Sequence, residues 1–253
     1  MMKLAILLVV GVIAKQAYGD EPEAIVGGSM ATRGQFPHQI SLQYYGSHIC
    51  GGTIIGSRKI LCAAHCVEDM SLSSLTVVSG GIRSSGDGER HEIESIKVHP
   101  GYTGRQSDGW KDDICVITLK KPIAMSSVQN VIPLASRDYA TGSYRGTISG
   151  FGKTSVNSGV SPYLLYANVN ILSTKDCLAA HPRNSWGGAY TTEKQICILE
   201  KRGIGACQGD SGGPLICNGE VVGVTSWVAP CALGVPDVYT CVLPYLSWIK
   251  ANL

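Results

Sequence analysis

Three short stretches of the chain carry side chains that can act together on a carbonyl group. They are "AAHC" (63–66), "DDIC" (112–115) and "GDSGGP" (209–214), which supply a histidine, an aspartate and a serine in that order. A serine hydroxyl is a weak nucleophile near neutral pH unless a base takes its proton during the attack. Histidine is suited to that transfer, and a carboxylate can orient the imidazole and stabilise its charged form. The three stretches therefore indicate nucleophilic catalysis.

Each stretch alone is a weak signal, because single histidines and Gly-Asp-Ser-Gly turns are common. Together with "IVGG" (25–28), they make the chain resemble the chymotrypsin family of serine endopeptidases, from residue 25 to the C-terminus. The resemblance implies that Ser211 is the nucleophile, that His65 is the base, and that Asp113, rather than its neighbour Asp112, orients His65. It also implies an oxyanion hole formed by the N–H groups of Gly209 and Ser211.

Short strands are expected to position these residues. The chain has 253 residues, of which 44% are hydrophobic, 16% are charged and 31 are glycine, which suits strands joined by tight turns. Apolar runs bounded by Gly, Ser, Asn or Pro favour antiparallel sandwiches or barrels; they lie at 38–45, 53–64, 114–119 and 220–228. The family resemblance implies an all-β fold of two packed six-stranded antiparallel β-barrels, at about 25–130 and about 131–245.

Two short helices are expected in addition. One covers 173–181, where Ser173 followed by Asp176 gives a start similar to a capping box. The other lies at about 243–253, because Leu246, Ile249 and Leu253 fall on one helical face.

The N-terminus predicts secretion. Residues 1–19 combine a Lys3 flank, an apolar run at 4–14 and small residues before position 20, as in a signal peptide. Eleven apolar residues are too few for a helix that crosses a bilayer of about 30 Å. Residues 20–24 would then form a short activation leader, and 25–253 the protease domain. The chain after residue 24 carries 19 basic and 16 acidic residues, and this small excess of positive charge does not suggest a nucleic-acid partner.

Ten cysteines in a secreted chain indicate disulfide bonds. The resemblance implies three bridges, namely Cys50–Cys66, Cys177–Cys197 and Cys207–Cys231. A fourth, nonstandard bridge is expected between Cys62 and Cys115, since they lie close in sequence to the catalytic histidine and aspartate, whose segments must converge. The usual partner position of Cys217 in the family is occupied by Gly146, so Cys217 and Cys241 are either free or paired in some other way.

A zinc site is the alternative interpretation of "CAAHC" (62–66). Zinc sites normally show two ligand pairs at defined spacing, and no second Cys/His pair of that kind is visible in the sequence. The segment 81–92 also lacks the spaced carboxylates of a calcium loop. No metal and no cofactor is expected.

The resemblance also implies activation by cleavage before Ile25. The new α-amino group would move inward and pair with Asp210, since a buried charge requires a partner. Members of the family commonly have Arg or Lys before the cut, whereas this chain has Ala24. We therefore expect an activating enzyme that accepts Ala or Pro, and not trypsin.

Residues that the resemblance assigns to the substrate pocket bear on specificity. They are Gly205, Ala206, Gln208, Ser226, Trp227, Val228 and Asp237. Gly205 stands where trypsin-like relatives have Asp, so the standard salt bridge to a basic substrate is missing. Val228 replaces a glycine of wide pockets and should penalise large rings. Asp237 lies on the back wall, where it is either hydrogen-bonded to neighbouring backbone N–H groups or paired with a substrate cation.

These features predict cleavage of proteins and peptides after Leu, Phe, Tyr or Met in a narrowed pocket, as in insect chymotrypsins. An elastase-like or broad specificity is the first alternative. The alternative from another class is a noncatalytic homologue that binds a partner, although all three triad residues are present. We expect a monomeric digestive or venom-type enzyme, with protein protease inhibitors as further partners and without nucleic-acid or membrane partners.

Overall fold

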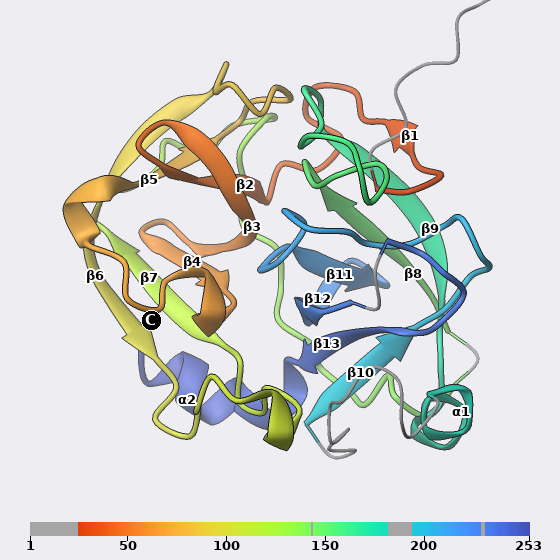
Figure 1. The fold of residues 1–253 in the computed structure, drawn as a ribbon. Helices are drawn as coiled ribbons and strands as arrows, with labels where there is room; N and C mark the ends of the chain where they lie inside the picture. The colour runs from red at the N-terminus through yellow and green to blue at the C-terminus, as the bar shows by residue number, and fades with distance from the viewer. Residues whose placement is uncertain (1–24, 143, 182–193, 229–230) are drawn as a thin grey trace, which may run out of the picture.

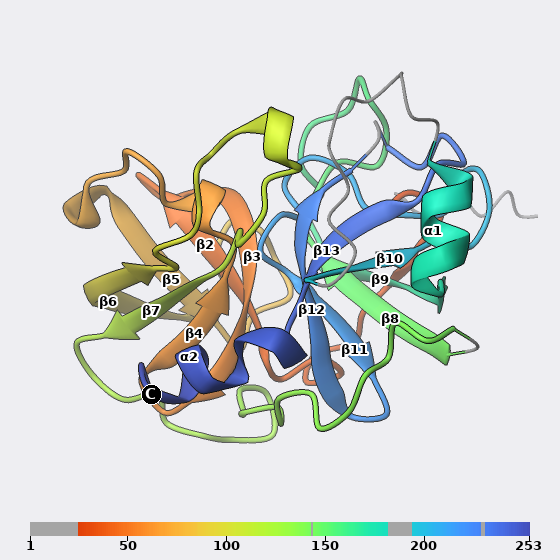
Figure 2. The same cartoon turned by 90° about the horizontal axis from the view of Figure 1, so that it is seen from below.

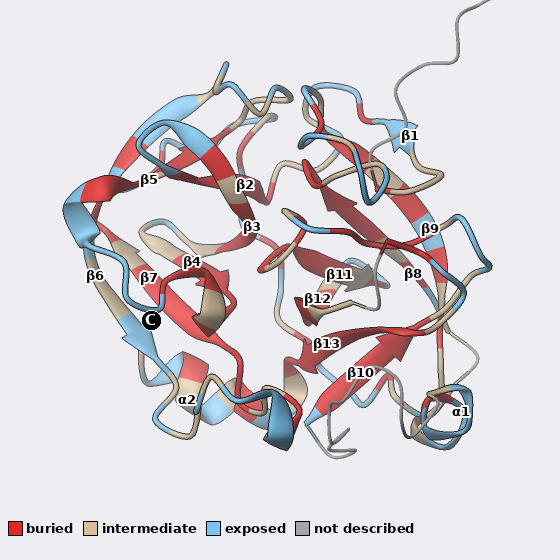
Figure 3. Cartoon of the chain, viewed as in Figure 1, coloured by how far each residue is buried: buried red, intermediate tan, exposed pale blue. Residues whose placement is uncertain are grey.

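A computed structural model of the chain describes residues 25–142, 144–181, 194–228 and 231–253. The expected signal peptide and activation leader lie outside the described residues. Two antiparallel β-barrels stand side by side, as the resemblance predicts (Figure 1). Each barrel encloses buried apolar side chains. Exposed residues lie on the outside of the molecule, for example along β6 (Glu89–Val98) (Figure 3).

The first barrel closes in the order β2-β3-β4-β7-β6-β5. Most of its strands are rich in apolar, often β-branched residues and are buried along nearly their whole length, whereas residues 90–94 alternate exposed and buried positions. The strands are β2 (Gln39–Tyr44), β3 (Ser47–Gly56), β4 (Lys59–Cys62), β5 (Leu75–Ser79), β6 (Glu89–Val98) and β7 (Cys115–Leu119).

The second barrel runs in the order β9-β10-β13-β12-β11-β8 and closes through the pairing of β8 with β9. Its strands are β8 (Tyr144–Gly150), β9 (Leu165–Ile171), β10 (Gln195–Ile198), β11 (Pro214–Cys217), β12 (Glu220–Trp227) and β13 (Asp237–Cys241). Strand β1 (Ser29–Met30) pairs with β9. The N-terminal segment thus joins the second barrel.

Both predicted helices are present. Helix α1 (Thr174–Ala180) begins at Ser173, whose hydroxyl accepts from the N–H of Asp176, as the capping pattern predicts. Helix α2 (Leu246–Lys250) follows a 3-10 turn at Leu243–Tyr245. It lies across the first barrel (Figure 2), where Lys59 of β4 donates from Nζ to the carbonyl of Asn252 at 2.6 Å. The end of the chain therefore ties the two barrels together.

None of the helices in the described ranges is long and apolar enough to cross a membrane.

Candidate active site

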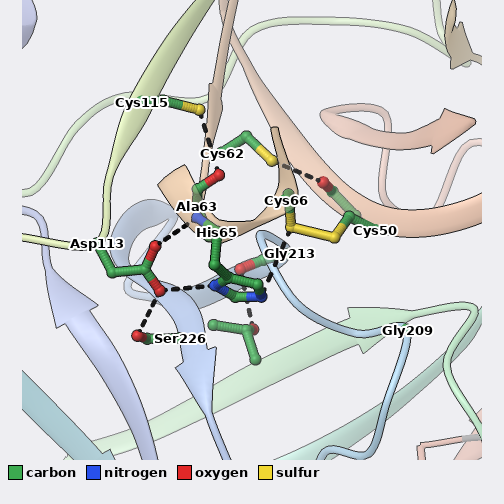
Figure 4. The surroundings of a disulfide bond; sticks show 12 residues. Cys50, Cys62, Ala63, His65, Cys66, Asp113, Cys115, Gly209, Gly213 and Ser226 are labelled. Carbon is green, nitrogen blue, oxygen red and sulfur yellow. Dashed lines mark hydrogen bonds and ion pairs between the residues drawn. A yellow bond between two sulfur atoms is a disulfide. The ribbon is translucent and has the colours of Figure 1, made fainter. Parts of the chain in front are cut away.

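His65 lies in a 3-10 turn (Ala64–Cys66) directly after β4. The disulfide between Cys50 and Cys66 anchors this turn to β3, and its sulfur atoms lie beside the imidazole (Figure 4). Strand β4 and the disulfide thus fix the position of His65 between the barrels.

Asp113 stands two residues before β7 and turns its carboxylate toward His65 (Figure 4). Oδ1 accepts from the backbone N–H of His65 at 2.9 Å, and Oδ2 lies 2.7 Å from Nδ1 of the ring. The Ser226 hydroxyl donates to Oδ2 at 2.6 Å, and the Thr240 hydroxyl donates to the Asp113 carbonyl at 2.8 Å. Because a carboxylate only accepts, Nδ1 carries the proton and Nε2 is available as a base.

Two opposing effects act on the His65 imidazole. Burial lowers its pKa, but the charge of Asp113, the hydrogen bond to Asp113 and the charge of Glu68 together raise it above the usual value. The Asp113 carboxylate itself is fully buried. This environment stabilises an imidazolium, as expected of a base that must hold a proton during a reaction.

The neighbouring Asp112 faces the other way. Its Oδ1 accepts from Lys194 Nζ at 2.8 Å and from the Tyr245 hydroxyl at 2.7 Å. Burial raises the pKa of Asp112. These two hydrogen bonds and the Lys194 charge together lower it by more, so that the net shift is downward. Of the two adjacent aspartates, only Asp113 contacts His65.

The loop that carries Ser211 packs onto the segment before His65. The Ser211 carbonyl accepts from the N–H of Gly51 at 2.7 Å. A Cβ at Gly212 would stand 2.5 Å from the sulfur of Cys62, and the φ of Gly212 is +76°, so this position requires glycine. Within the described chain, no hydrogen bond joins the Ser211 hydroxyl to His65. Such bonds are often long before substrate binds.

Two peptides of the loop that carries Ser211 are each held by a hydrogen bond to their carbonyl oxygen. The Gln208 carbonyl accepts from Lys153 N at 2.8 Å, and the Asp210 carbonyl accepts from Gly213 N at 3.0 Å. In a trans peptide the N–H points opposite to the C=O. The N–H group of Gly209 therefore points away from Lys153 N, and that of Ser211 points away from Gly213 N.

His48 holds this loop and was not found from the sequence. Its Nε2 lies 2.9 Å from the Gly209 carbonyl, so it donates, and its Nδ1 lies 2.8 Å from the Ser41 hydroxyl. Burial lowers the pKa of His48 to about 4, although the hydrogen bond to Gly209 raises it in part. The neutral ring thus fixes the Gly209 peptide. A lone histidine in β3 carries no sequence signal that would reveal this contact.

Asp210 and Ile25 are both buried. Asp210 Oδ1 accepts from Gly152 N at 2.8 Å and Oδ2 from Cys207 N at 3.0 Å. Burial raises its pKa to about 7, while these hydrogen bonds lower it. In the uncleaved chain, Val26 is bridged to Gly205, and the described residues provide no cation that pairs with Asp210.

Of the residues expected in the substrate pocket, Gly205, Ala206 and Asp237 lie together, and Gln208 lies beside the Cys207–Cys231 disulfide. Gly205 N donates to the Val26 carbonyl, and the N–H of Ala206 donates to Asp237 Oδ2. The Ser226 hydroxyl donates to Asp113 Oδ2. Trp227 lies with its ring centroid 5.8 Å from that of Trp110, and Val228 is partly buried against the core. The Gln208 side chain is exposed.

The structure contains the three bridges that the resemblance implies: Cys50–Cys66, Cys177–Cys197 and Cys207–Cys231. The fourth expected bridge is not formed, because Cys62 and Cys115 are both buried thiols. They are directly opposite in β4 and β7, but their thiols donate to the carbonyls of Gly51 and Ala63. Cys217 and Cys241 are also buried thiols.

Two groups of side chains in the described part of the chain bring three metal-ligating atoms together. They are Cys50, His65 and Cys66, and Cys177, His181 and Cys197. In both groups the cysteines form a disulfide. A disulfide sulfur is not the thiolate that binds a metal, so neither group suits zinc.

The contact of His65 with Asp113, between two β-barrels and next to the loop that carries Ser211, is typical of a serine endopeptidase. A family model described as Trypsin matches residues 25–249. Over the full chain, the sequence is 38% identical to trypsin delta of Drosophila melanogaster and 39% identical to trypsin beta of Drosophila erecta, covering each of these relatives completely. It is also 37% identical to trypsin I-P1 of Gallus gallus, of which it covers 99%. The chain belongs to the trypsin family of serine endopeptidases.

Proposed function

We propose that the chain is the precursor of a secreted, monomeric digestive or venom-type endopeptidase that hydrolyses proteins through an acyl-enzyme. The observation that supports this most strongly is the contact of Asp113 with both the backbone N–H and Nδ1 of His65, at 2.9 and 2.7 Å. It leaves Nε2 of the imidazole, which lies 3.8 Å from Cys66 Sγ, without a proton and able to act as the base. Protein protease inhibitors are the further partners that this proposal includes.

In the first half of the reaction, the Ser211 Oγ attacks the scissile carbonyl carbon, and its proton passes to His65 Nε2. The carbonyl oxygen becomes an oxyanion that accepts from the N–H groups of Gly209 and Ser211. Loss of one such donor typically costs about 2.7–4 kcal/mol in the transition state. The proton on Nε2 then passes to the leaving amine as the C–N bond breaks.

In the second half, water replaces the amine. His65 takes a proton from the water, which attacks the acyl carbon, and the same proton returns to Ser211 Oγ as the ester breaks. Asp113 keeps the imidazole oriented and offsets its positive charge in both halves. Ser226 and Thr240 hold Asp113 in this position.

Removal of the segment before Ile25 would activate the enzyme. The new α-amino group of Ile25 would pair with the buried Asp210, whose oxygens accept only from backbone N–H groups in the uncleaved chain. An ion pair there would stabilise the nucleophile loop in the conformation that exposes the N–H groups of Gly209 and Ser211.

We propose cleavage after Leu, Phe, Tyr or Met, with the bulkiest rings disfavoured. Gly205 provides no carboxylate at the expected floor of the pocket, and the β-branched Val228 narrows its wall. Profiling of cleavage sites on a peptide library tests this preference. A preference for small side chains would instead support an elastase-like specificity.

Labelling of Ser211 by an organophosphate tests whether the chain is an enzyme. The chain cleaved before Ile25 should be labelled, and the Ser211→Ala variant should not. An activated protein that stays unlabelled would instead support a noncatalytic binding protein.

A further inference from the structure

The hairpin between β2 and β3 ends in an unusual turn. Tyr44 and Ser47 are paired at its end, so Tyr45 and Gly46 form a two-residue loop. The φ angles of these two residues are +45° and +83°. Positive φ at both positions is typical of a type I′ turn, in which Asn-Gly is strongly preferred. Tyr45 is therefore an aromatic residue whose backbone conformation is unfavourable for a bulky side chain.

The Tyr45 side chain contributes little to the fold in return. Tyr45 is 77% exposed, and its ring meets that of Tyr44 edge to face, with the centroids 4.6 Å apart. The N–H of Tyr45 donates to the Ser74 carbonyl at 2.9 Å, a contact that any residue except proline can make. Backbone strain of this kind clusters at functional sites. Because tyrosine is enriched where proteins contact one another, the exposed ring is suited to binding another molecule.

A hollow in the protein surface lies next to this hairpin. It has a volume of about 600 Å³, and its apolar lining consists of Leu72, Leu75 and Ile93. Leu75 is paired with Tyr44 across β5 and β2, and Leu72 is exposed. We call these three residues, together with Tyr44 and Tyr45, the hairpin patch.

The charged groups at the rim of the hollow pair with one another. Lys120 Nζ lies 2.7 Å from Glu92 Oε2, and Glu94 forms an ion pair with Arg58. The lining of the hollow therefore presents no surplus charge that would select an ion. An apolar side chain is the ligand that suits the hollow, since it would cover the apolar floor without displacing an ion pair.

Strand β3 connects the hairpin patch to the candidate active site. It leads from the hairpin to Cys50, whose disulfide partner Cys66 follows His65 directly. Tyr45 precedes Cys50 by five residues, which corresponds to roughly 17 Å along the strand. The residues assigned to the substrate pocket belong to the second barrel. A polypeptide that occupies this pocket before its scissile bond would continue past His65 onto the first barrel.

We infer that the hairpin patch binds a protein substrate through an apolar residue about five positions after the scissile bond. This inference rests on the proposed function. The rings of Tyr44 and Tyr45 pack against the substrate chain, and its apolar side chain fills the hollow beside Leu72. Peptides that end soon after the scissile bond do not reach these residues. The patch thus favours long, extended protein segments over short peptides.

The Tyr45→Asn variant separates this role from a structural one. Asn suits a type I′ turn better than Tyr, so the midpoint of thermal unfolding should stay unchanged or rise. For a long peptide, with Leu before the bond, about eight residues after it and Leu at the fifth of these, kcat/KM should nonetheless fall about fivefold or more through KM. The same peptide ended two residues after the bond should be cleaved as before. Leu178→Gln, an exposed apolar position of α1, is the matched control and should change neither value.

A binding measurement does not depend on catalysis. The chain cleaved before Ile25 and carrying Ser211→Ala should bind the long peptide about fivefold or more tightly than the short one, as measured by the fluorescence anisotropy of labelled peptides. Adding Tyr45→Asn should remove this difference. Tyr45→Phe, which keeps the ring, should preserve it.

The outcomes separate the two proposals. Equal binding and equal cleavage of the long and short peptides, in an enzyme that is labelled at Ser211, would overturn the role of the hairpin patch alone. A lower unfolding midpoint of Tyr45→Asn with equal loss on both peptides would also overturn it, because it would indicate a structural role. Sedimentation that shows a dimer abolished by Tyr45→Asn would assign the patch to a second copy instead. Absence of labelling and of any cleavage would overturn the proposed function, and the binding measurement would then decide the role of the patch by itself.

Discussion

Cys62 and Cys115 face each other as directly paired residues of β4 and β7, and both side chains are fully buried as thiols. Each thiol donates to a backbone carbonyl, and burial, together with the neighbouring Cys62 sulfur and Asp113, raises the pKa of Cys115 well above the usual value. A protonated, enclosed thiol is a poor nucleophile. The pair therefore resists oxidation, although it lies next to both His65 and Asp113.

A thiol count checks this arrangement. We expect four thiols per chain to react with a maleimide after unfolding in denaturant, and almost none in the native protein, because all four free cysteines are buried. The Cys217→Ser variant should reduce the count by one. A count of two after unfolding, together with a disulfide-linked peptide that contains Cys62 and Cys115, would contradict the free thiols and support the bridge expected from the sequence.

The adjacent aspartates provide a matched pair of variants. Asp113→Asn should lower kcat by about 10⁴-fold, because the amide stabilises the wrong imidazole tautomer. Asp112→Asn should cost about 1–3 kcal/mol of unfolding free energy, since it weakens the contacts with Lys194 and Tyr245, and should change kcat little. Steady-state kinetics and denaturant unfolding of both variants check this. Equal loss of kcat in both would contradict the division of roles.

The buried Asp210 predicts a dependence of stability on pH in the uncleaved chain. Because burial raises its pKa to about 7, the folded chain keeps a proton that the unfolded chain loses near pH 4. Stability is then fully present below pH 4 and falls as the pH rises toward 7. Over about three pH units this amounts to roughly 4 kcal/mol at most.

Asp210→Asn removes this titration. The unfolding free energy of the variant, relative to the native sequence, should therefore rise by a few kcal/mol between pH 4 and pH 7. Denaturant unfolding at several pH values measures the difference, with Asp176→Asn as an exposed control. After cleavage before Ile25 the new amino group should lower the pKa of Asp210 and abolish the trend. A difference that stays constant with pH would argue against a protonated Asp210.

His48 should affect the chemical step more than substrate binding. His48→Leu removes the donor to the Gly209 carbonyl, which frees the Gly209–Asp210 peptide, next to the peptides that carry the N–H groups of Gly209 and Ser211. We expect kcat to fall about ten- to a hundredfold with a small change in KM. The variant His91→Leu removes a similarly buried histidine of the first barrel and controls for general destabilisation. Comparable losses in both variants would contradict a specific role of His48.

Activation should not depend on trypsin. Because Ala24 precedes Ile25, incubation of the secreted precursor with trypsin should leave it inactive, whereas an enzyme that cleaves after Ala should activate it. The Ala24→Arg variant should reverse this and become activatable by trypsin. N-terminal sequencing of the products checks both. Rapid activation of the native precursor by trypsin, with Ile25 as its new terminus, would refute the expectation.

The sequence by itself determined the chemistry and the class of fold. Ser211, His65 and Asp113 stand in short motifs whose residue types and order are specific, and strands, caps and helices follow from local patterns such as Ser173 with Asp176. Such features depend on neighbours within a few residues, so they can be found without coordinates. Three disulfides also followed from the resemblance.

The tertiary structure decided contacts between residues that are far apart in the chain. It turned Asp112 toward Tyr245, joined His48 to Gly209, and kept Cys62 and Cys115 as hydrogen-bonded thiols. It also left Oδ1 of Asp237 without a hydrogen-bond partner among the described residues. The direction of a side chain and the partners of a buried oxygen depend on packing between segments, on which local sequence carries no information. The class of enzyme could therefore be predicted from motifs, whereas the partners of these buried side chains could not.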